Sequence, residues 1–108
     1  MSELTKKKCE PCEGDIPPMP DDKAEEMLKQ TPDWEKEGKK IQREFKFKDF
    51  VEAMKFVNKV ADLAESEDHH PDIHIYWNKV QLVLWTHAIG GLSENDFIMA
   101  AKVNEINM

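Results

Sequence analysis

The sequence predicts an α+β fold, a two-layer sandwich in which a four-stranded antiparallel sheet carries about three helices on one face. Two observations predict this class. Apolar residues recur at three- and four-residue spacing in three segments, which is typical of helices, and at every second position in four segments, which is typical of strands. The segments follow one another as helix, two strands, helix, two strands, helix, so each pair of strands can form a hairpin.

Residues 1–20 are expected to form an extended leader, and residues 21–108 a single domain. Prolines at positions 11, 17, 18 and 20 disfavour both regular helix and central strand in the leader. A short helix should follow, capped by Asp21 or Asp22 and stopped at Thr31-Pro32.

Two strands are expected next, at residues 34–37 and 39–47, with Gly38 in the turn between them. In the longer strand Ile41 and Phe45 fall on one face, because side chains alternate along a strand. That face is mostly apolar and should be buried.

The clearest helix follows Asp49, which together with Glu52 resembles a capping box. Seven apolar side chains then recur at helical spacing and should form its buried face: Phe50, Ala53, Met54, Val57, Val60, Ala61 and Ala64. The helix should end near residues 65–68 and place the pair His69-His70 at its C-terminal end.

After Pro71 the apolar period becomes two, which predicts two strands joined near Asn78-Lys79. Gly90-Gly91 should break the chain, and Ser93, with Asp96 three residues later, should cap a last helix. The apolar side of that helix is expected to contain Phe97, Ala100, Ala101, Val103 and Ile106.

The formal net charge is -7, from 15 basic and 22 acidic residues. This balance argues against a general nucleic-acid-binding protein, because phosphate contacts need a basic face. No apolar run approaches the roughly 18–20 residues that span a bilayer, and no apolar segment follows the basic residues near the start. Neither a membrane partner nor a secretory signal is therefore expected, and the expected location is cytoplasmic.

The two cysteines, Cys9 and Cys12, form a single C-x-x-C pair. They provide no disulfide framework, and in a reducing compartment they should be thiols. Zinc would need two further ligands, and the flanking lysine and proline are not typical of a redox site. The pair is therefore a weak signal for metal or redox chemistry.

All four histidines lie between residues 65 and 87. Imidazole, with an unperturbed pKa of about 6.5, can give or take a proton near neutrality. His69 and His70 sit at a helix-to-strand junction and His87 at the far end of an adjoining strand, so the three can converge. His74 falls on the polar face of a strand and is expected to be solvated. The cluster predicts a site for a small heteroaromatic molecule.

Two carboxylates and two indoles could complete this site. Glu65 precedes His69 by four residues, so it would either form an ordinary helical ion pair or orient the imidazole, if the helix extends that far. Asp96 could be a helix cap, a site residue, or both. Trp34 and Trp85 could stack on a flat ring, although the strip that contains Trp85 is equally well explained as a subunit interface.

Taken together, several of these residues resemble the pterin-4a-carbinolamine dehydratases. The resemblance covers about residues 21–107 and rests on short motifs in this order: Trp34, Phe45-Lys46-Phe47-Lys48-Asp49-Phe50, Glu65, His69-His70-Pro71, Trp77-Asn78-Lys79-Val80, Thr86-His87, and Gly91-Leu92-Ser93-Glu94 with Asp96. The leader looks like that of microbial members. In animal members a basic residue is expected where this chain has Asn95.

The resemblance implies a hydro-lyase that removes water from 4a-hydroxytetrahydropterin to give quinonoid dihydropterin. This step would regenerate tetrahydrobiopterin for aromatic amino acid hydroxylases, without a metal or a cofactor other than the pterin substrate. A homodimer or homotetramer is implied. Family roles carry over to matching positions: His69, His70 and His87 as catalytic imidazoles, and Glu65, Asp96, Pro71 and Trp34 as supporting or substrate-binding residues.

The residues alone agree with such a reaction, because two imidazoles of opposite protonation state supply both an acid and a base. Two alternatives remain open. The chain could be an interaction module, a dimerisation cofactor with a vestigial pterin pocket. It could also be a small zinc protein that uses His69, His70 and His87 as ligands.

Overall fold

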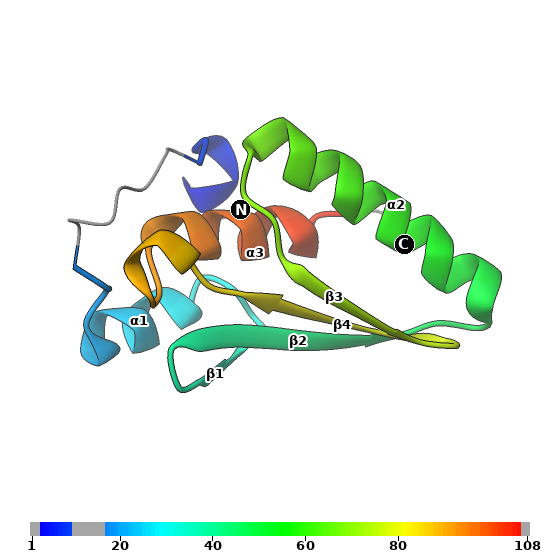
Figure 1. Ribbon diagram of the computed structural model, residues 1–108, viewed down its shortest axis with the longest axis horizontal. Coiled ribbons are helices and arrows are strands. Elements are labelled where there is room, and N and C mark those ends of the chain that lie inside the picture. Colours follow the sequence, from blue (N-terminus) through cyan, green and yellow to red (C-terminus); the bar gives the residue numbers. More distant parts are fainter. Residues whose placement is uncertain (1–2, 10–16, 107–108) are drawn as a thin grey trace.

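The computed structural model describes residues 3–9 and 17–106 of the chain. Its elements are η1 (Glu3–Lys6), α1 (Asp21–Leu28), β1 (Glu35–Glu37), β2 (Lys40–Lys46), α2 (Phe50–Glu67), β3 (Asp72–Tyr76), β4 (Lys79–Leu84), η2 (His87–Ile89) and α3 (Glu94–Asn104). The four strands pair antiparallel in the order β1-β2-β4-β3, with the helices above one face (Figure 1). The predicted α+β class is confirmed.

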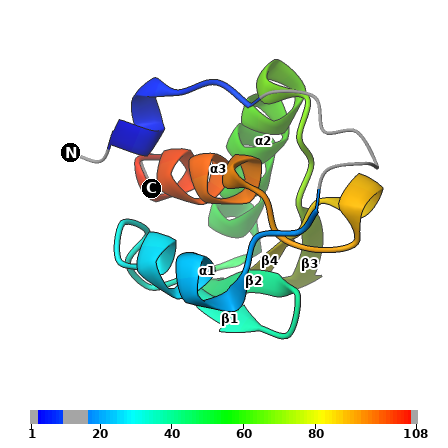
Figure 2. The same ribbon diagram turned by 90° about the vertical axis from the view of Figure 1, so that its left-hand side faces the viewer.

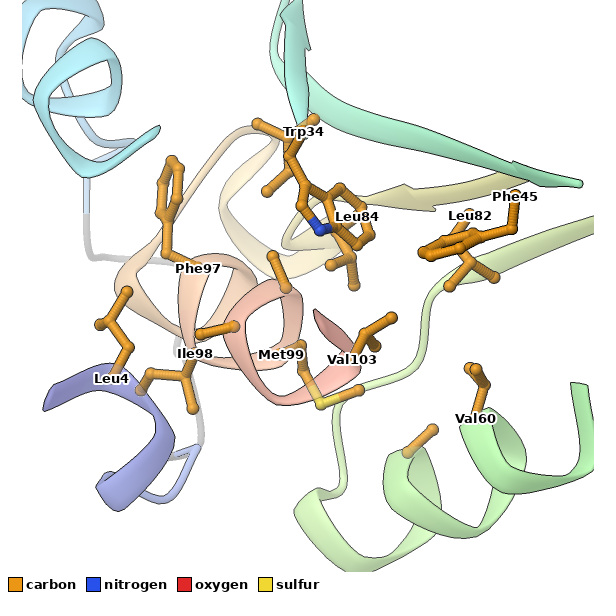
Figure 3. Packing of buried hydrophobic residues seen from close by; sticks show 14 of the residues in the cluster. Leu4, Trp34, Phe45, Val60, Leu82, Leu84, Phe97, Ile98, Met99 and Val103 are labelled. Carbon is orange, nitrogen blue, oxygen red and sulfur yellow. The ribbon is translucent and has the colours of Figure 1, made fainter. Parts of the chain in front are cut away.

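The core lies between the two central strands and the helices. Ile41 on β2 and Leu84 on β4 pair directly and are fully buried, as the period-two pattern predicts. Phe45 packs against Phe56 of α2, with ring centroids 4.6 Å apart. Figure 3 shows the inner side chains of β2 and β4 facing Val60 of α2 and the side chains of α3.

Asp49 and Asp68 set the two ends of helix α2. The Asp49 side chain accepts a hydrogen bond from the Glu52 backbone N–H at 3.0 Å, as predicted. Phe50, expected on the buried face, is 47% exposed, whereas Phe56 is buried. The helix stops at Glu67 because Asp68 adopts the left-handed conformation (φ 52°).

Helix α3 begins with the predicted capping box between Ser93 and Asp96. It is buried on more sides than the sequence suggests, because Ile98 and Met99 are buried as well as the expected face. The cover of Ile98 includes η1, whose Leu4 is 2% exposed and lies beside Ile98 in Figure 3. A leader extended throughout is therefore wrong for Glu3–Lys6, which coil into a 3-10 helix to bury Leu4.

Two smaller expectations are corrected. Pro20, and neither Asp21 nor Asp22, occupies the cap of α1, because both aspartates already lie in its first turn. The β3-β4 hairpin turns at Trp77-Asn78, one residue earlier than expected, with Trp77 at a positive φ of 50°. Within the described ranges, no helix combines the length and apolar character needed to cross a membrane.

Candidate active site

A cavity of about 480 Å³ opens where the end of α2, the start of β3, the end of β4 and the start of α3 meet. Its volume is within the range typical of small-molecule sites. The lining includes three of the four histidines and their neighbours: His69, His70, Pro71, Trp85, Thr86, His87 and Asn95. The predicted convergence of the three histidines on one cavity is therefore present.

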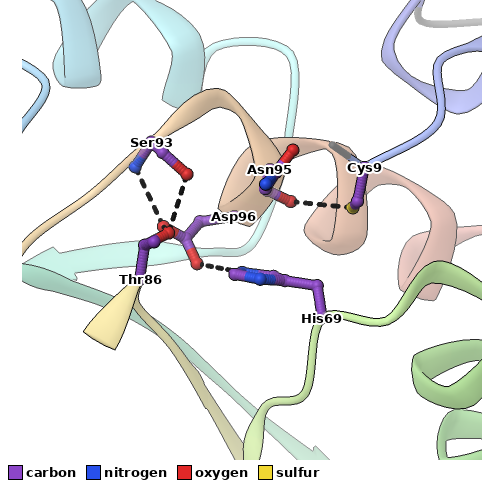
Figure 4. Close-up of polar contacts among 6 residues, drawn as sticks. All are labelled: Cys9, His69, Thr86, Ser93, Asn95 and Asp96. Carbon is purple, nitrogen blue, oxygen red and sulfur yellow. Dashed lines mark hydrogen bonds and ion pairs between the residues drawn. The ribbon is translucent and has the colours of Figure 1, made fainter. Parts of the chain in front are cut away.

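His69 is held by a buried carboxylate. Its Nε2 lies 2.7 Å from Oδ1 of Asp96, which is completely buried (Figure 4). The other carboxylate oxygen accepts hydrogen bonds from the Thr86 hydroxyl at 2.9 Å and from the Ser93 backbone N–H at 3.0 Å. Asp96 thus belongs to the capping box of α3 and is also the partner of His69; the hydrogen bonds from Thr86 and Ser93 hold the carboxylate that orients the imidazole.

The direction of the chain after α2 explains why His69 pairs with Asp96 and not with Glu65. Asp68 in the left-handed conformation ends the helix, so His69 does not continue its helical face. Glu65, which was expected to share a face with His69, pairs instead with His70, whose Nε2 lies 2.6 Å from Oε2 of Glu65. A face shared with His69 required α2 to persist to that residue, and α2 ends at Glu67.

The two histidine-carboxylate pairs differ in burial. The side chain of His69 is 12% exposed and that of Asp96 is 0% exposed, whereas His70 and Glu65 are 52% and 79% exposed. Exposed ion pairs are screened by water and contribute little. The buried pair is therefore the better candidate for a fixed catalytic group.

This difference makes a prediction about Glu65. Replacing Glu65 with glutamine should lower kcat for any reaction at this site by less than about threefold and the free energy of unfolding by less than about 1 kcal/mol, since its ion pair is solvent-screened. Steady-state kinetics and urea unfolding would measure both. A tenfold or larger loss of kcat would show that the exposed pair has a catalytic role.

His87 and Trp85 form another part of the cavity wall. Their ring centroids are 4.0 Å apart with an interplanar angle of 36°. The indole Nε1 of Trp85 is buried without a hydrogen-bond partner among the described residues. A buried donor without a partner lowers the free energy of unfolding by about 1–3 kcal/mol, so the burial of this indole N–H is unfavourable for the stability of the fold.

Two residues considered at the sequence level lie elsewhere. Trp34, implied as a pocket wall, does not line this cavity: it is 5% exposed, and its Nε1 donates to the Asn104 side chain at 2.9 Å. The position just before β1 places this indole in the core beside the end of α3, as Figure 3 shows. His74 is exposed on β3 and does not line the cavity, as expected.

Sequence reasoning gave no chemical role to Thr86. Its hydroxyl donates to Asp96 and lies 2.7 Å from the Ser93 hydroxyl, so it links the end of β4 to the cap of α3. The sequence signal that could have indicated a role for Thr86 is a polar residue directly after an apolar strand. Cys9 is buried, and Cys12 lies outside the described residues.

Over residues 3–9 and 17–106, no group of three or more His, Cys, Asp or Glu side chains is arranged to hold a metal ion. His69 and His70 each engage a carboxylate through Nε2.

Comparison with known proteins gives a consistent result. The family model described as pterin 4 alpha carbinolamine dehydratase matches residues 17–106. A protein of Methylococcus capsulatus that bears this family's name is 50% identical over 95% of this chain and 92% of its own length. Pterin-4-alpha-carbinolamine dehydratase 2, mitochondrial, of Arabidopsis thaliana is 43% identical over all of this chain and 61% of its own length.

A solved structure agrees with the sequence matches. The crystal structure of a transcriptional coactivator/pterin dehydratase from Brucella melitensis superposes with a TM-score of 0.76 at 37% identity, covering 81% of this chain and 95% of that one. Sequence, fold and the histidine cavity thus agree: the chain belongs to the pterin 4 alpha carbinolamine dehydratase family.

Proposed function

We propose that this protein is a hydro-lyase that converts 4a-hydroxytetrahydropterin to quinonoid dihydropterin and water. The observation that carries the proposal is the buried His69–Asp96 pair at the wall of a cavity that His70 and His87 also line. Family membership supports the substrate class, and the cavity volume of about 480 Å³ is suited to a bicyclic ring.

The reaction needs two proton transfers and no change of oxidation state. The C4a–O bond breaks as the leaving hydroxyl accepts a proton from an acid and departs as water. A base removes the proton from N5, and the electron pair of that N–H bond forms the C4a–N5 double bond. An imidazolium and a neutral imidazole can supply these roles, each contributing about a hundredfold to ten-thousandfold.

His69 is the best-organised group for one of these transfers. With Asp96 ionised, Nε2 of His69 donates to Oδ1 and the tautomer is fixed, so Nδ1 is the ring nitrogen left for the substrate. The second transfer is assigned to His87 or His70, because both line the same cavity. Pro71 and Trp85 provide flat apolar surface against which a pterin ring can pack.

We further propose that the pterin is the substrate and that no other cofactor or metal takes part. The test is dehydration of 4a-hydroxytetrahydropterin generated in place by a hydroxylase, using the chain as purified and the chain treated with a strong chelator that is removed before the assay. The expected result is acceleration over the uncatalysed rate that chelation leaves unchanged. Loss of the rate on chelation, restored by zinc, would support a zinc enzyme instead.

The physiological setting is also a proposal. The reaction would serve tetrahydrobiopterin recycling for an aromatic amino acid hydroxylase, in the cytoplasm, by a homodimer or homotetramer. The half-buried Val83 and Trp85 lie on the sheet face that the helices leave uncovered, which favours a partner subunit there. Sedimentation analysis of the purified chain would test the assembly.

One alternative has a specific observation in its favour. The structural relative from Brucella melitensis is described as a transcriptional coactivator as well as a pterin dehydratase. An interaction module with a vestigial pocket predicts that the wild-type chain binds a pterin but gives no acceleration. Measuring binding and turnover on the same preparation separates the two functions.

A further inference from the structure

Residues 3–9 lie before the part of the chain that matches the family model, which begins at residue 17. They are nevertheless packed into the fold, since Leu4 is 2% and Cys9 is 9% exposed. Figure 2 shows this segment, in blue, running over α3 towards the end of α2. We call residues 3–9 the strap.

Three consecutive strap residues contact the two helix ends that bound the cavity. The Lys7 ammonium lies 3.2 Å from the Glu94 carboxylate of α3, and the Lys8 ammonium donates to the Ser66 carbonyl of α2 at 3.4 Å. Cys9 bridges both helices. Its backbone N–H donates to Glu67 of α2 at 2.9 Å, and its thiol donates to the backbone carbonyl of Asn95 at 3.6 Å (Figure 4).

These contacts lie next to the buried catalytic pair. Glu67 is the last residue of α2, two positions before His69, and Asn95 immediately precedes Asp96. The Cys9 bridge therefore spans the same gap as the 2.7 Å contact between His69 and Asp96. Lys102 of α3 reinforces it, because its ammonium lies 2.8 Å from the second carboxylate oxygen of Glu67.

We propose that the strap positions His69 and Asp96 by tying the end of α2 to the first turn of α3, with Glu67 and Leu4 as positioning residues. Leu4 anchors one end of the strap beside Ile98, and Glu67 anchors the other through Cys9. The inference rests on the proposed function for its kinetic consequence. Its structural content is independent of that function.

The electrostatics of the bridge fit a structural role. Burial works to raise the pKa of the Glu67 carboxyl, but hydrogen bonds from Lys102 and the Cys9 backbone outweigh it and leave the pKa below the usual 4.5. Burial, followed by the Glu67 charge, raises the pKa of the Cys9 thiol to about 12. Glu67 is therefore an anionic acceptor at neutral pH, and Cys9 stays a protonated donor and a poor nucleophile.

The test uses Leu4→Ala and Glu67→Ala, which change the two ends of the strap without removing a cavity-lining side chain. Each is expected to lower kcat about five- to tenfold, since small displacements of catalytic groups are costly. Glu67→Gln, which keeps an acceptor for the Cys9 N–H, should recover part of the loss. Val57→Ala is the control, because Val57 is buried on α2 and does not line the cavity.

Two further readouts distinguish positioning from general destabilisation. Combining Glu67→Ala with Asp96→Asn should cost no more kcat than Asp96→Asn alone, because the strap acts through that pair. The Nε2 proton of His69 should give a hydrogen-bonded NMR resonance in wild type that exchanges with water faster in both strap variants. This resonance does not depend on turnover, so it tests the strap even if the chain catalyses nothing.

Losses of kcat no larger than that of Val57→Ala, with an unchanged His69 resonance, would overturn the inference. Additive losses in the double variant would overturn it as well. A wild-type chain without dehydratase activity, but with a resonance that responds to Leu4→Ala, would contradict the proposed function and support the strap.

Discussion

Replacing Asp96 with asparagine is expected to lower kcat for dehydration by about a hundredfold or more while leaving the chain folded. The asparagine oxygen can still accept from Thr86 and from the Ser93 backbone N–H, which preserves the cap of α3. Its NH₂ group then faces Nε2 of His69, so this nitrogen must accept instead of donate. The imidazole is forced into the other tautomer.

Steady-state kinetics and urea unfolding of Asp96→Asn would measure the two effects. Asp62→Asn is a matched control, because Asp62 is exposed on α2 and the substitution is the same. A variant that keeps more than about a third of wild-type kcat would show that Asp96 is only a helix cap.

Replacing His69 with alanine is the change with the largest expected effect on activity. The loss of one well-placed acid or base should lower kcat by about a hundredfold to ten-thousandfold. His74→Ala is the matched control, since His74 is exposed on β3 away from the cavity and should leave kcat unchanged. Equal activities of the two variants would remove His69 from the mechanism.

Much of the fold could be predicted because one face of each main element is buried in a single core. The period-two pattern in β2 and β4 and the helical stripe in α2 both mark buried faces. The burial of Ile98 could not be predicted, because its cover includes Leu4 of η1 (Figure 3), from a segment that looked irregular. Local patterns do not show which distant segment packs on a helix.

The clustering of the histidines could be predicted from the sequence, but the carboxylate that each histidine contacts could not. The capping motif identified Asp96, and the position of His69 and His70 at a helix end suggested a cluster. The partners depended on one backbone angle, the positive φ of Asp68, which separates His69 from Glu65. An aspartate in the left-handed conformation is uncommon enough that sequence alone does not predict it.

Trp34 shows a second limit of sequence reasoning. A tryptophan next to a strand can stack on a ligand or fill the core, and the residue type alone does not distinguish the two uses. Here the Asn104 side chain, from the end of α3, accepts its N–H. Only the position of the end of α3, which supplies Asn104, decides between the two.

We propose that His69 and its neighbours catalyse the dehydration of 4a-hydroxytetrahydropterin. The most direct test compares wild type with His69→Ala/His70→Ala, using substrate generated in place by a hydroxylase and following the quinonoid product. We expect acceleration by wild type and a rate close to the uncatalysed background for the double variant. Equal acceleration by both proteins, or none by wild type, would contradict it.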